Sequence, residues 1–360
     1  MTVDIFNSFY KNKKVLVTGH TGFKGSWLSI WLHELGAEVV GLGLEPYTYK
    51  DNFVLSRIGE KIKADIRADI RDFQNIKKIF AEYKPEIVFH LAAQPLVRLS
   101  YEIPIETYQT NVMGSINILE AIRATDSVKV VVMITTDKCY DNKEQMRGYK
   151  EDDPLGGYDP YSSSKGACEI AIQSWRRSFF NPNDYGKRHH VSLASVRAGN
   201  VIGGGDWAKD RIIPDCIRAI EAGNLIEIRS PKAIRPWEHV LEPLSAYLLL
   251  AQKMWEYPTG YSEGWNFGPE SNSVSTVWDV ATMFVQSLDR GVLKDVSDTN
   301  TLHEANILLL DNTKAKIRLG WKPRLDVLQT INLVADWYKR YQTEEVYKLC
   351  VNEIISFLEQ

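Results

Sequence analysis

A glycine-rich loop near the start of the chain constrains the fold most. Residues 19–25 (GHTGFKG) directly follow the short apolar run 14–18 (KVLVT), and the segment 26–35 then carries apolar residues at helical spacing. Glycines let the backbone approach a pyrophosphate closely, and the helix that follows directs its N-terminus at the negative charge. This strand–loop–helix context predicts a dinucleotide site after the first strand.

Strand and helix patterns alternate through the first 200 residues. Further strands are predicted at 38–44, 63–66, 86–92, 128–135 and 191–196, and further helices at 76–83, 108–123 and 161–180. Apolar strands separated by helices imply a parallel sheet covered on both faces, with ligands beyond the carboxyl ends of its strands. We therefore expect a doubly wound parallel sheet, a Rossmann fold.

After residue 200 the pattern becomes less regular, as expected of a part built from insertions and the C-terminal tail. We expect a dinucleotide-binding domain from residues 1–200 and 236–268. A smaller interleaved substrate domain would come from residues 201–235 and 269–360.

Composition excludes several classes of protein. The chain has 360 residues and a net charge of -3, with no global bias toward nucleic acid or anionic membranes. Its four cysteines stand far apart without a CxxC pair, which fits neither a zinc site nor a disulfide framework. Apolar runs such as 247–251 are too short to span a bilayer, and the first residues do not read as a signal peptide. We expect a soluble, cytoplasmic protein without a bound metal.

Tyr161 and Lys165 are the strongest catalytic candidates. Residues four apart share one helix face, so the phenol and the ammonium can point into the same cleft. A phenol with a pKa of about 10 is a poor base at neutral pH, but a nearby cation and a positive nicotinamide ring both lower that pKa. We therefore expect Tyr161 to act as acid and base on a hydroxyl–carbonyl pair.

Three residues just past the 128–135 strand join this pair, namely Thr136, Asp137 and Lys138. Doubly wound folds place catalytic groups at such strand ends. Thr136 can hydrogen-bond the substrate oxygen that Tyr161 deprotonates. Asp137 and Lys138 add an acid and a base that simple alcohol oxidation does not need, unless they form a surface ion pair.

Two residues bear on the choice of dinucleotide. Glu45 ends the second strand about 20 residues after Gly25, where a carboxylate accepts hydrogen bonds from the adenosine ribose and favours NAD. Lys24, in the glycine loop, could instead pair with a 2′-phosphate and favour NADP. We expect NAD.

Further segments resemble the extended short-chain dehydrogenase/reductase family, over roughly residues 14–270. They are residues 68–72 (ADIRD), 91–94 (LAAQ), Asn111, 197–203 (RAGNVIG) and 235–240 (RPWEHV). Within this family a Thr-Asp-acidic triplet marks the sugar-nucleotide 4,6-dehydratases, and residues 136–140 (TDKCY) resemble it. The chain departs from that pattern at Lys138, where a glutamate is usual.

The resemblance implies a lyase that dehydrates CDP-glucose to CDP-4-dehydro-6-deoxyglucose with tightly held NAD, feeding deoxysugar synthesis for surface polysaccharide. It implies catalysis by Thr136, Asp137, Lys138, Tyr161 and Lys165. Implied cofactor contacts are Gly19, Thr21, Gly22, Phe23, Lys24, Gly25, Glu45, Asp69, Ile70, Leu91, Ala92, Ala93, Asn111, Tyr161 and Lys165. Implied substrate contacts are Gln94, Asn200, Arg211, Arg235 and His239. The family also implies a homodimer formed by the helices near 104–123 and 161–179.

Two alternatives stay open. A C4 epimerase or reductase on the same scaffold needs only Tyr161, Lys165 and Thr136, and leaves Asp137 and Lys138 without a role. A catalytically silent dinucleotide-sensing protein needs none of the five.

Overall fold

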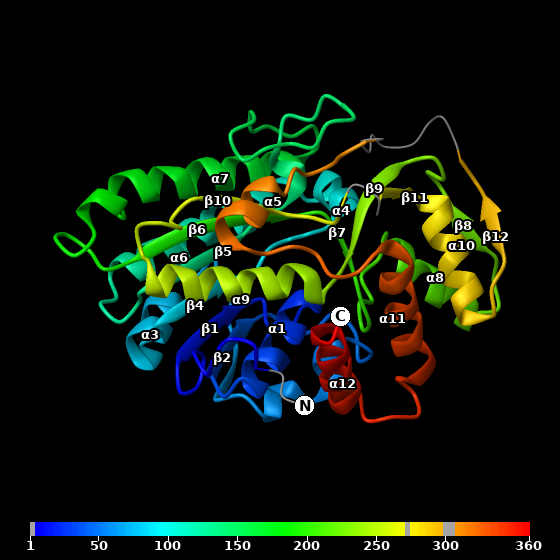
Figure 1. The fold of residues 1–360 in the computed structure, drawn as a ribbon, viewed down its shortest axis with the longest axis horizontal. Coiled ribbons are helices and arrows are strands. Elements are labelled where there is room, and N and C mark those ends of the chain that lie inside the picture. The colour runs from blue at the N-terminus through cyan, green and yellow to red at the C-terminus, as the bar shows by residue number, and fades with distance from the viewer. Residues whose placement is uncertain (1–3, 271–273, 298–306) are drawn as a thin grey trace.

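A seven-stranded parallel sheet forms the centre of the computed structural model, which describes residues 4–270, 274–297 and 307–360 (Figure 1). The strands in spatial order are β10 (Gly264–Phe267), β6 (Ser192–Ala198), β5 (Val130–Ile134), β4 (Ile87–His90), β1 (Lys14–Thr18), β2 (Glu38–Gly43) and β3 (Ala64–Arg67). All neighbouring pairs are parallel. The strand order reverses between β1 and β4, where doubly wound folds bind their ligands. The expected Rossmann architecture is confirmed.

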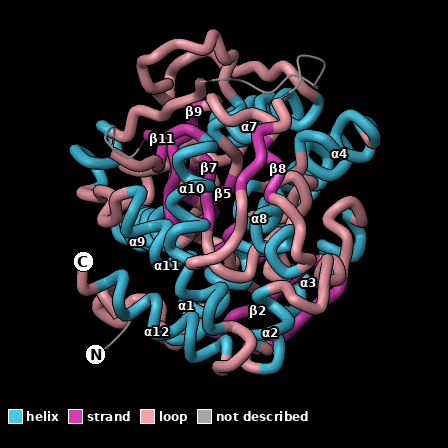
Figure 2. Tube along the Cα trace, turned by 90° about the vertical axis from the view of Figure 1, so that its right-hand side faces the viewer, coloured by secondary structure: helices cyan, strands magenta, loops and turns pink. Residues whose placement is uncertain are grey.

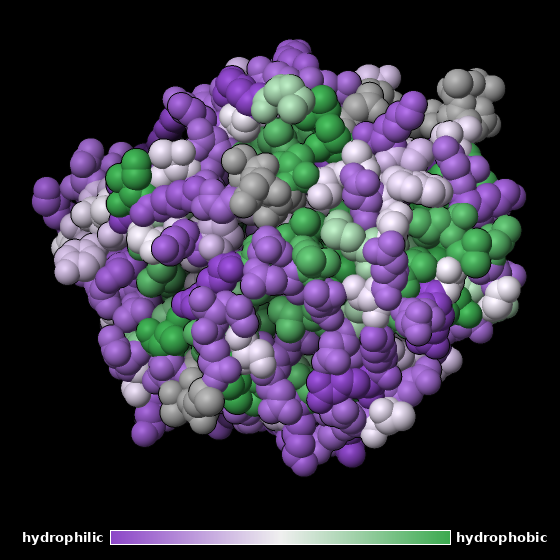
Figure 3. Space-filling model, turned by 45° about the vertical axis from the view of Figure 1, so that its right-hand side comes forward, coloured by the Kyte–Doolittle hydropathy of each residue, from purple (hydrophilic) through white to green (hydrophobic). Residues whose placement is uncertain are grey.

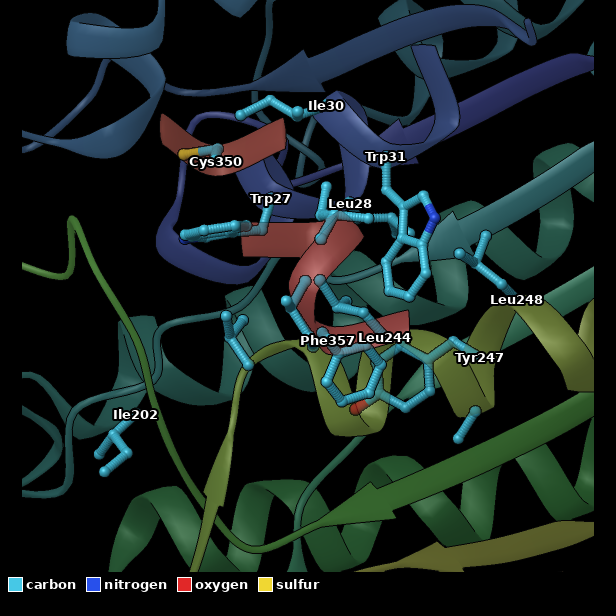
Figure 4. Close-up of a cluster of buried hydrophobic side chains, with 14 of the residues drawn as sticks. Trp27, Leu28, Ile30, Trp31, Ile202, Leu244, Tyr247, Leu248, Cys350 and Phe357 are labelled. Atoms are coloured by element: carbon cyan, nitrogen blue, oxygen red, sulfur yellow. The ribbon is translucent and has the colours of Figure 1, made fainter. Parts of the chain in front are cut away.

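Helices cover both faces of the sheet. Alternate strand residues point to opposite faces, and β1 has apolar, buried residues on both of them. On one face, Val15 and Val17 of β1 share a core with α1 (Phe23–Glu34), α9 (Leu241–Glu256) and α12 (Val346–Leu358). Figure 4 shows part of this core, with Trp31 of α1, Tyr247 of α9 and Phe357 of α12 lying together.

On the other face, Leu16 of β1 packs with α3 (Phe73–Tyr83), α6 (Gly114–Arg123) and α7 (Pro160–Ser178). α7 begins where we expected, because Asp159 caps it by accepting a hydrogen bond from the backbone N–H of Ser162 and Pro160 occupies its first turn. Both catalytic candidates on α7 therefore lie in its first two turns.

The rest of the chain builds a smaller part beside the strand ends, which faces the viewer in Figure 2. Its strands are β7 (Asn200–Ile202), β9 (Ile234–His239) and β11 (Val274–Thr276) in one sheet, and β8 (Ile226–Ile228) and β12 (Leu293–Asp295) in another. Its helices are α8 (Ile212–Glu221), α10 (Val277–Leu288) and α11 (Val327–Arg340). Short helices α2 (Asn52–Ser56), α4 (Val97–Glu102) and α5 (Pro104–Tyr108) lie in the connections of the first half.

The two parts interleave along the chain. The chain leaves the large sheet after β6 and returns to it for α9 and β10. The last helix, α12, packs against α1 and α2, so it lies with the dinucleotide-binding half although we assigned residues 269–360 to the substrate domain. The apolar side of α12, with Cys350 and Phe357, completes the core over α1. This packing is why α12 lies with the dinucleotide-binding half and not with the substrate domain. The exact domain boundaries stay a prediction.

The expected helix 108–123 is interrupted by one turn. α5 ends at Tyr108, a π-helical turn spans Gln109–Met113, and α6 follows directly. Such turns occur frequently at functional sites. This one contains Asn111, which the family resemblance singled out.

Among residues 4–270, 274–297 and 307–360, every helix is too short or too polar to span a bilayer. The face in Figure 3 is mostly polar, with apolar side chains in scattered patches. Within the same described ranges, no group of three or more His, Cys, Asp or Glu side chains is arranged to hold a metal ion.

Candidate active site

A cleft of about 1500 Å³ opens at the carboxyl ends of the central strands. Its walls are the segments that follow β1, β2, β4 and β5, the start of α7, and the smaller part of the molecule from β7 to β9. Pockets for one small molecule usually measure about 300–1,000 Å³. The cleft therefore has room for two ligands side by side.

The glycine loop forms the wall of the cleft between β1 and α1. Gly19 has a φ of +74°, and a Cβ there would lie 2.8 Å from the backbone nitrogen of Ala92. A Cβ on Gly25 would overlap the carbonyl oxygen of Gly19. α1 begins after Gly22, whose lack of a side chain leaves the first helical N–H groups without a side-chain cap. This cradle fits the diphosphate of a dinucleotide.

The far end of this wall carries the residues expected at the ribose and adenine. Glu45 lines the cleft with 77% of its side chain exposed, and its Oε2 lies 3.3 Å from Nε of Arg67. Asp69 and Ile70 also line the cleft, and Asp69 forms an ion pair with Arg71. Glu45 is therefore accessible to a ribose hydroxyl.

Lys24 lies away from the ribose and adenine end of the cleft. The charges that act on it most are those of Glu238, Arg211 and Asp137, and burial lowers its pKa to about 8. Lys24 thus lies near the candidate catalytic residues Asp137 and Lys165, and the alternative in which it binds a 2′-phosphate loses its support.

Thr136, Asp137 and Lys138 all line the cleft, as expected. Thr136 caps a 3-10 turn at Asp137–Cys139 and donates a hydrogen bond from its hydroxyl to Asp137 Oδ1, 2.9 Å away. Among the described residues, the buried Oδ2 of Asp137 has no hydrogen-bond partner. Lys138 is half-buried, and no ion pair to it is found in those residues. The alternative in which Asp137 and Lys138 form a surface ion pair therefore finds no support in those residues, and both side chains line the cleft.

Tyr161 and Lys165 lie on the cleft wall formed by α7. Burial raises the pKa of Tyr161 to about 12, against the opposing effects of a hydrogen bond with Thr136 and the charge of Arg211. This direction is opposite to the lowering that we expected from Lys165. Burial also lowers the pKa of Lys165, whose Nζ donates to the carbonyl of Ile134 at 3.4 Å. A positive charge on a ligand next to Tyr161 would lower this pKa and favour its action as a base.

Four of the five expected substrate residues line the cleft, and the fifth, His239, does not. Asn200, Arg211 and Arg235 line the cleft on the side of the smaller part of the molecule. Arg211 pairs with Asp206 at 2.8 Å and still lies near Tyr161. Gln94 lines the cleft too, but its amide group is already hydrogen-bonded to the backbone of Leu96 and to other protein groups.

Two expected contacts lie outside the cleft lining. His239 is fully buried, its Nε2 lies 2.9 Å from Glu353 of α12, and its ring packs edge-on against Trp27. Asn111 is also buried and joins Gln94 to Ser164 of α7 through its amide. Both residues hold elements together, and the structure shows neither at the surface of the cleft.

Sequence reasoning missed two buried groups behind the site. Glu238 lies beside Lys24, and burial raises its pKa well above the usual range. Glu169 and Arg197 form a buried ion pair at 2.9 Å behind the catalytic turn. Arg197 and Glu238 belonged to segments that resemble the family, 197–203 and 235–240, but were given no role of their own. The signal for Glu169 was its position one helical turn after Lys165, on the face that carries Tyr161.

Comparison with known proteins agrees with this geometry. The family model described as GDP-mannose 4,6 dehydratase matches residues 16–334. The chain is 50% identical over 352 residues to a CDP-glucose 4,6-dehydratase from Salmonella typhimurium, covering 98% of each chain.

Solved structures show the same fold. MoeE5 in complex with UDP-glucose and NAD is 25% identical, with a TM-score of 0.76 over 92% of this chain and 100% of that one. The NAD complex of dTDP-glucose 4,6-dehydratase from Bacillus anthracis is 20% identical, with a TM-score of 0.75 over 94% of this chain and 99% of that one. The resemblance to the extended short-chain dehydrogenases/reductases is confirmed, and the chain belongs to the GDP-mannose 4,6 dehydratase family.

Proposed function

We propose that this protein dehydrates CDP-glucose to CDP-4-dehydro-6-deoxyglucose and uses NAD as a cofactor that is regenerated in each turnover. The observation that carries the proposal is the meeting of Thr136, Asp137, Lys138, Tyr161 and Lys165 in one cleft with the glycine loop. An oxidation alone needs the tyrosine, lysine and threonine. The additional acid and base fit a reaction that also removes water. The 50% identical relative, a CDP-glucose 4,6-dehydratase from Salmonella typhimurium, supports the choice of substrate.

The residues that would hold NAD line one half of the cleft. The uncapped start of α1 suits the diphosphate, Glu45 suits the ribose, and residues 68–71 suit the adenine. Bound NAD would supply a hydride acceptor for C4 and later a donor for C6. The sugar nucleotide would occupy the other half, where the guanidinium of Arg235 and the amide of Asn200 suit its diphosphate.

Three of these five side chains, Tyr161, Lys138 and Asp137, each move a separate proton. Tyr161 removes the proton of the C4 hydroxyl while Thr136 hydrogen-bonds the same oxygen. The ketone at C4 then acidifies the hydrogen at C5, which Lys138 removes. Asp137, protonated, donates to the departing hydroxyl at C6, and its unpartnered Oδ2 suits that role. As the hydride taken from C4 goes to C6, Lys138 returns a proton to C5. The proton that Tyr161 removed replaces, through solvent, the one that Asp137 gave to the departing hydroxyl, so the steps balance with the loss of one water.

We also propose that the protein forms a homodimer through α5–α6 and α7. Exposed apolar side chains on these elements support this, with Ile105 73% exposed, Met113 51% exposed and Ile170 59% exposed. The measurement is the mass of the protein in solution, and a monomer at all concentrations would overturn it.

The deciding experiment offers CDP-, UDP-, dTDP- and GDP-hexoses separately to the purified protein, and measures the mass of the product and the configuration of its C4 by NMR. We expect the loss of one water from CDP-glucose alone. A product of unchanged mass with inverted C4 would identify an epimerase, and a product two hydrogens heavier or lighter would identify a reductase or dehydrogenase. If no sugar nucleotide is turned over, the alternative of a catalytically silent dinucleotide-sensing protein would be favoured.

A further inference from the structure

A buried network lies directly behind the catalytic turn, and the reaction proposed above does not use it. Its centre is the ion pair of Glu169 on α7 with Arg197 on β6, and both side chains are at most 2% exposed. The guanidinium holds the carboxylate with two hydrogen bonds, Nε to Oε1 at 3.0 Å and Nη2 to Oε2 at 2.9 Å. A buried pair of this kind adds little net stability, because desolvation offsets its attraction.

The carboxylate is firmly ionised. Burial alone would raise the pKa of Glu169, but the charge and hydrogen bonds of Arg197 and the hydroxyl donors outweigh it and lower that pKa to about 2. One of these donors is Ser195 on β6, 2.9 Å from Oε2. The other is Thr135, whose hydroxyl lies 2.6 Å from Oε1.

These partners connect the ion pair to both ends of the catalytic segment. Thr135 immediately precedes Thr136, so Glu169 holds the start of the segment. At the other end, Nη1 of Arg197 donates to the hydroxyl of Tyr140 at 2.6 Å. The Tyr140 hydroxyl in turn donates to Asn266 of β10 at 2.7 Å.

Between these two ends, the segment packs closely against α7. A Cβ on Gly166 of α7 would overlap the carbonyl oxygen of Gly156 and lie 3.3 Å from that of Cys139. The amide of Gly156 also donates to the Cys139 carbonyl at 2.9 Å. The catalytic turn is therefore pressed against the helix that carries Tyr161 and Lys165.

From these contacts we propose that Glu169 and Arg197 are positioning residues that clamp both ends of residues 136–139, and so set the acid and base groups against Tyr161. The expected effect on kcat rests on the proposed function. The clamping of residues 136–139 rests only on the contacts described above. A shift of about 1 Å in such groups can cost about 100-fold in rate, so a clamp at both ends has a direct catalytic effect.

The test cuts each link without touching the ion pair. Thr135→Val removes the hydroxyl at the start, and Tyr140→Phe removes the one at the end while keeping its ring stacked on Tyr149. The matched control is Ser195→Ala, which removes a hydrogen bond to the same carboxylate but has no link to the segment. We expect kcat to fall about tenfold in each single variant and about 100-fold in the double, with KM for CDP-glucose unchanged. The control should lose thermal stability to a similar extent and keep its kcat.

A second measurement does not depend on the substrate. Hydrogen–deuterium exchange of the amides in residues 136–140 should accelerate in the Thr135 and Tyr140 variants and not in the control. Unchanged exchange, unchanged kcat in the double variant, or an equal loss of kcat in Ser195→Ala would overturn the inference. If the wild-type protein fails to dehydrate CDP-glucose, the proposed function is wrong, and the exchange measurement still decides whether the clamp exists.

Discussion

Replacing Tyr161 with Phe tests the chemistry at its first step. Burial raises the pKa of this phenol from 10.0 to about 12. Two pKa units correspond to about 2.7 kcal/mol, which is the added cost of forming the phenolate inside the cleft. The raised pKa is that of Tyr161 with Lys165 already in place, so the positive ring of a bound nicotinamide is the further charge that would offset this cost. Without the hydroxyl there is no proton acceptor at C4, and kcat should fall at least about 100-fold, or about 2.7 kcal/mol in barrier.

Folding should survive this change. Phe keeps the ring and loses one hydrogen bond with Thr136, worth about 1 kcal/mol, so Tm should fall by only a few degrees. The assay follows the mass of the product under saturating substrate, and NAD binding is measured separately by fluorescence. Tyr83→Phe, at the end of α3, is the control for removing the same atom away from the cleft. Near-normal turnover by Tyr161→Phe would refute the assignment of this residue as the base.

Three further predictions concern other groups. Glu45→Ala should narrow the preference for NAD over NADP in binding measurements, and stronger NADP-supported activity in the wild type would contradict the cofactor assignment. Lys138→Met should let enzyme-bound NADH accumulate while solvent deuterium entry at C5 falls steeply, and exchange at the wild-type rate would show that another group is the base. Burial raises the pKa of Glu242 to about 7 from 4.5, so its contribution to stability is complete below pH 4.5 and is lost as the pH rises through 7. Glu242→Gln should therefore raise the free energy of unfolding at pH 8 by at most about 3 kcal/mol and change it little at pH 5, and an equal gain at both pH values would argue against the raised pKa.

Short-range sequence patterns were sufficient to predict the dinucleotide-binding half of the fold. Strand β1, the glycine loop and α1 follow one another within residues 14–34, and each is recognised by short-range spacing. The same holds for Tyr161 and Lys165, because four residues along a helix return a side chain to the same face whatever surrounds it. Thr136, Asp137 and Lys138 could be placed at the cleft because the carboxyl ends of parallel strands meet at one edge.

The irregular second half was predicted only in outline. Its strands have as few as three residues, and their pairing joins segments distant in sequence, such as β9 with β11. The packing of α12 on α1 likewise depends on a surface that exists only after the sheet has formed. Short strands and late-packing helices carry too little periodic signal to be located in advance.

The sequence by itself therefore determined the Rossmann fold, the glycine cradle and the candidate catalytic side chains, since local spacing and the alternation of strands with helices indicate all three. Only the tertiary structure decided how buried charges are arranged around them. It moved His239 from the expected substrate site into a pair with Glu353, and it set Lys24 beside Glu238. It also raised the pKa of Tyr161. Burial and charge pairing depend on which distant segments surround a side chain, and that is a property of the folded chain alone.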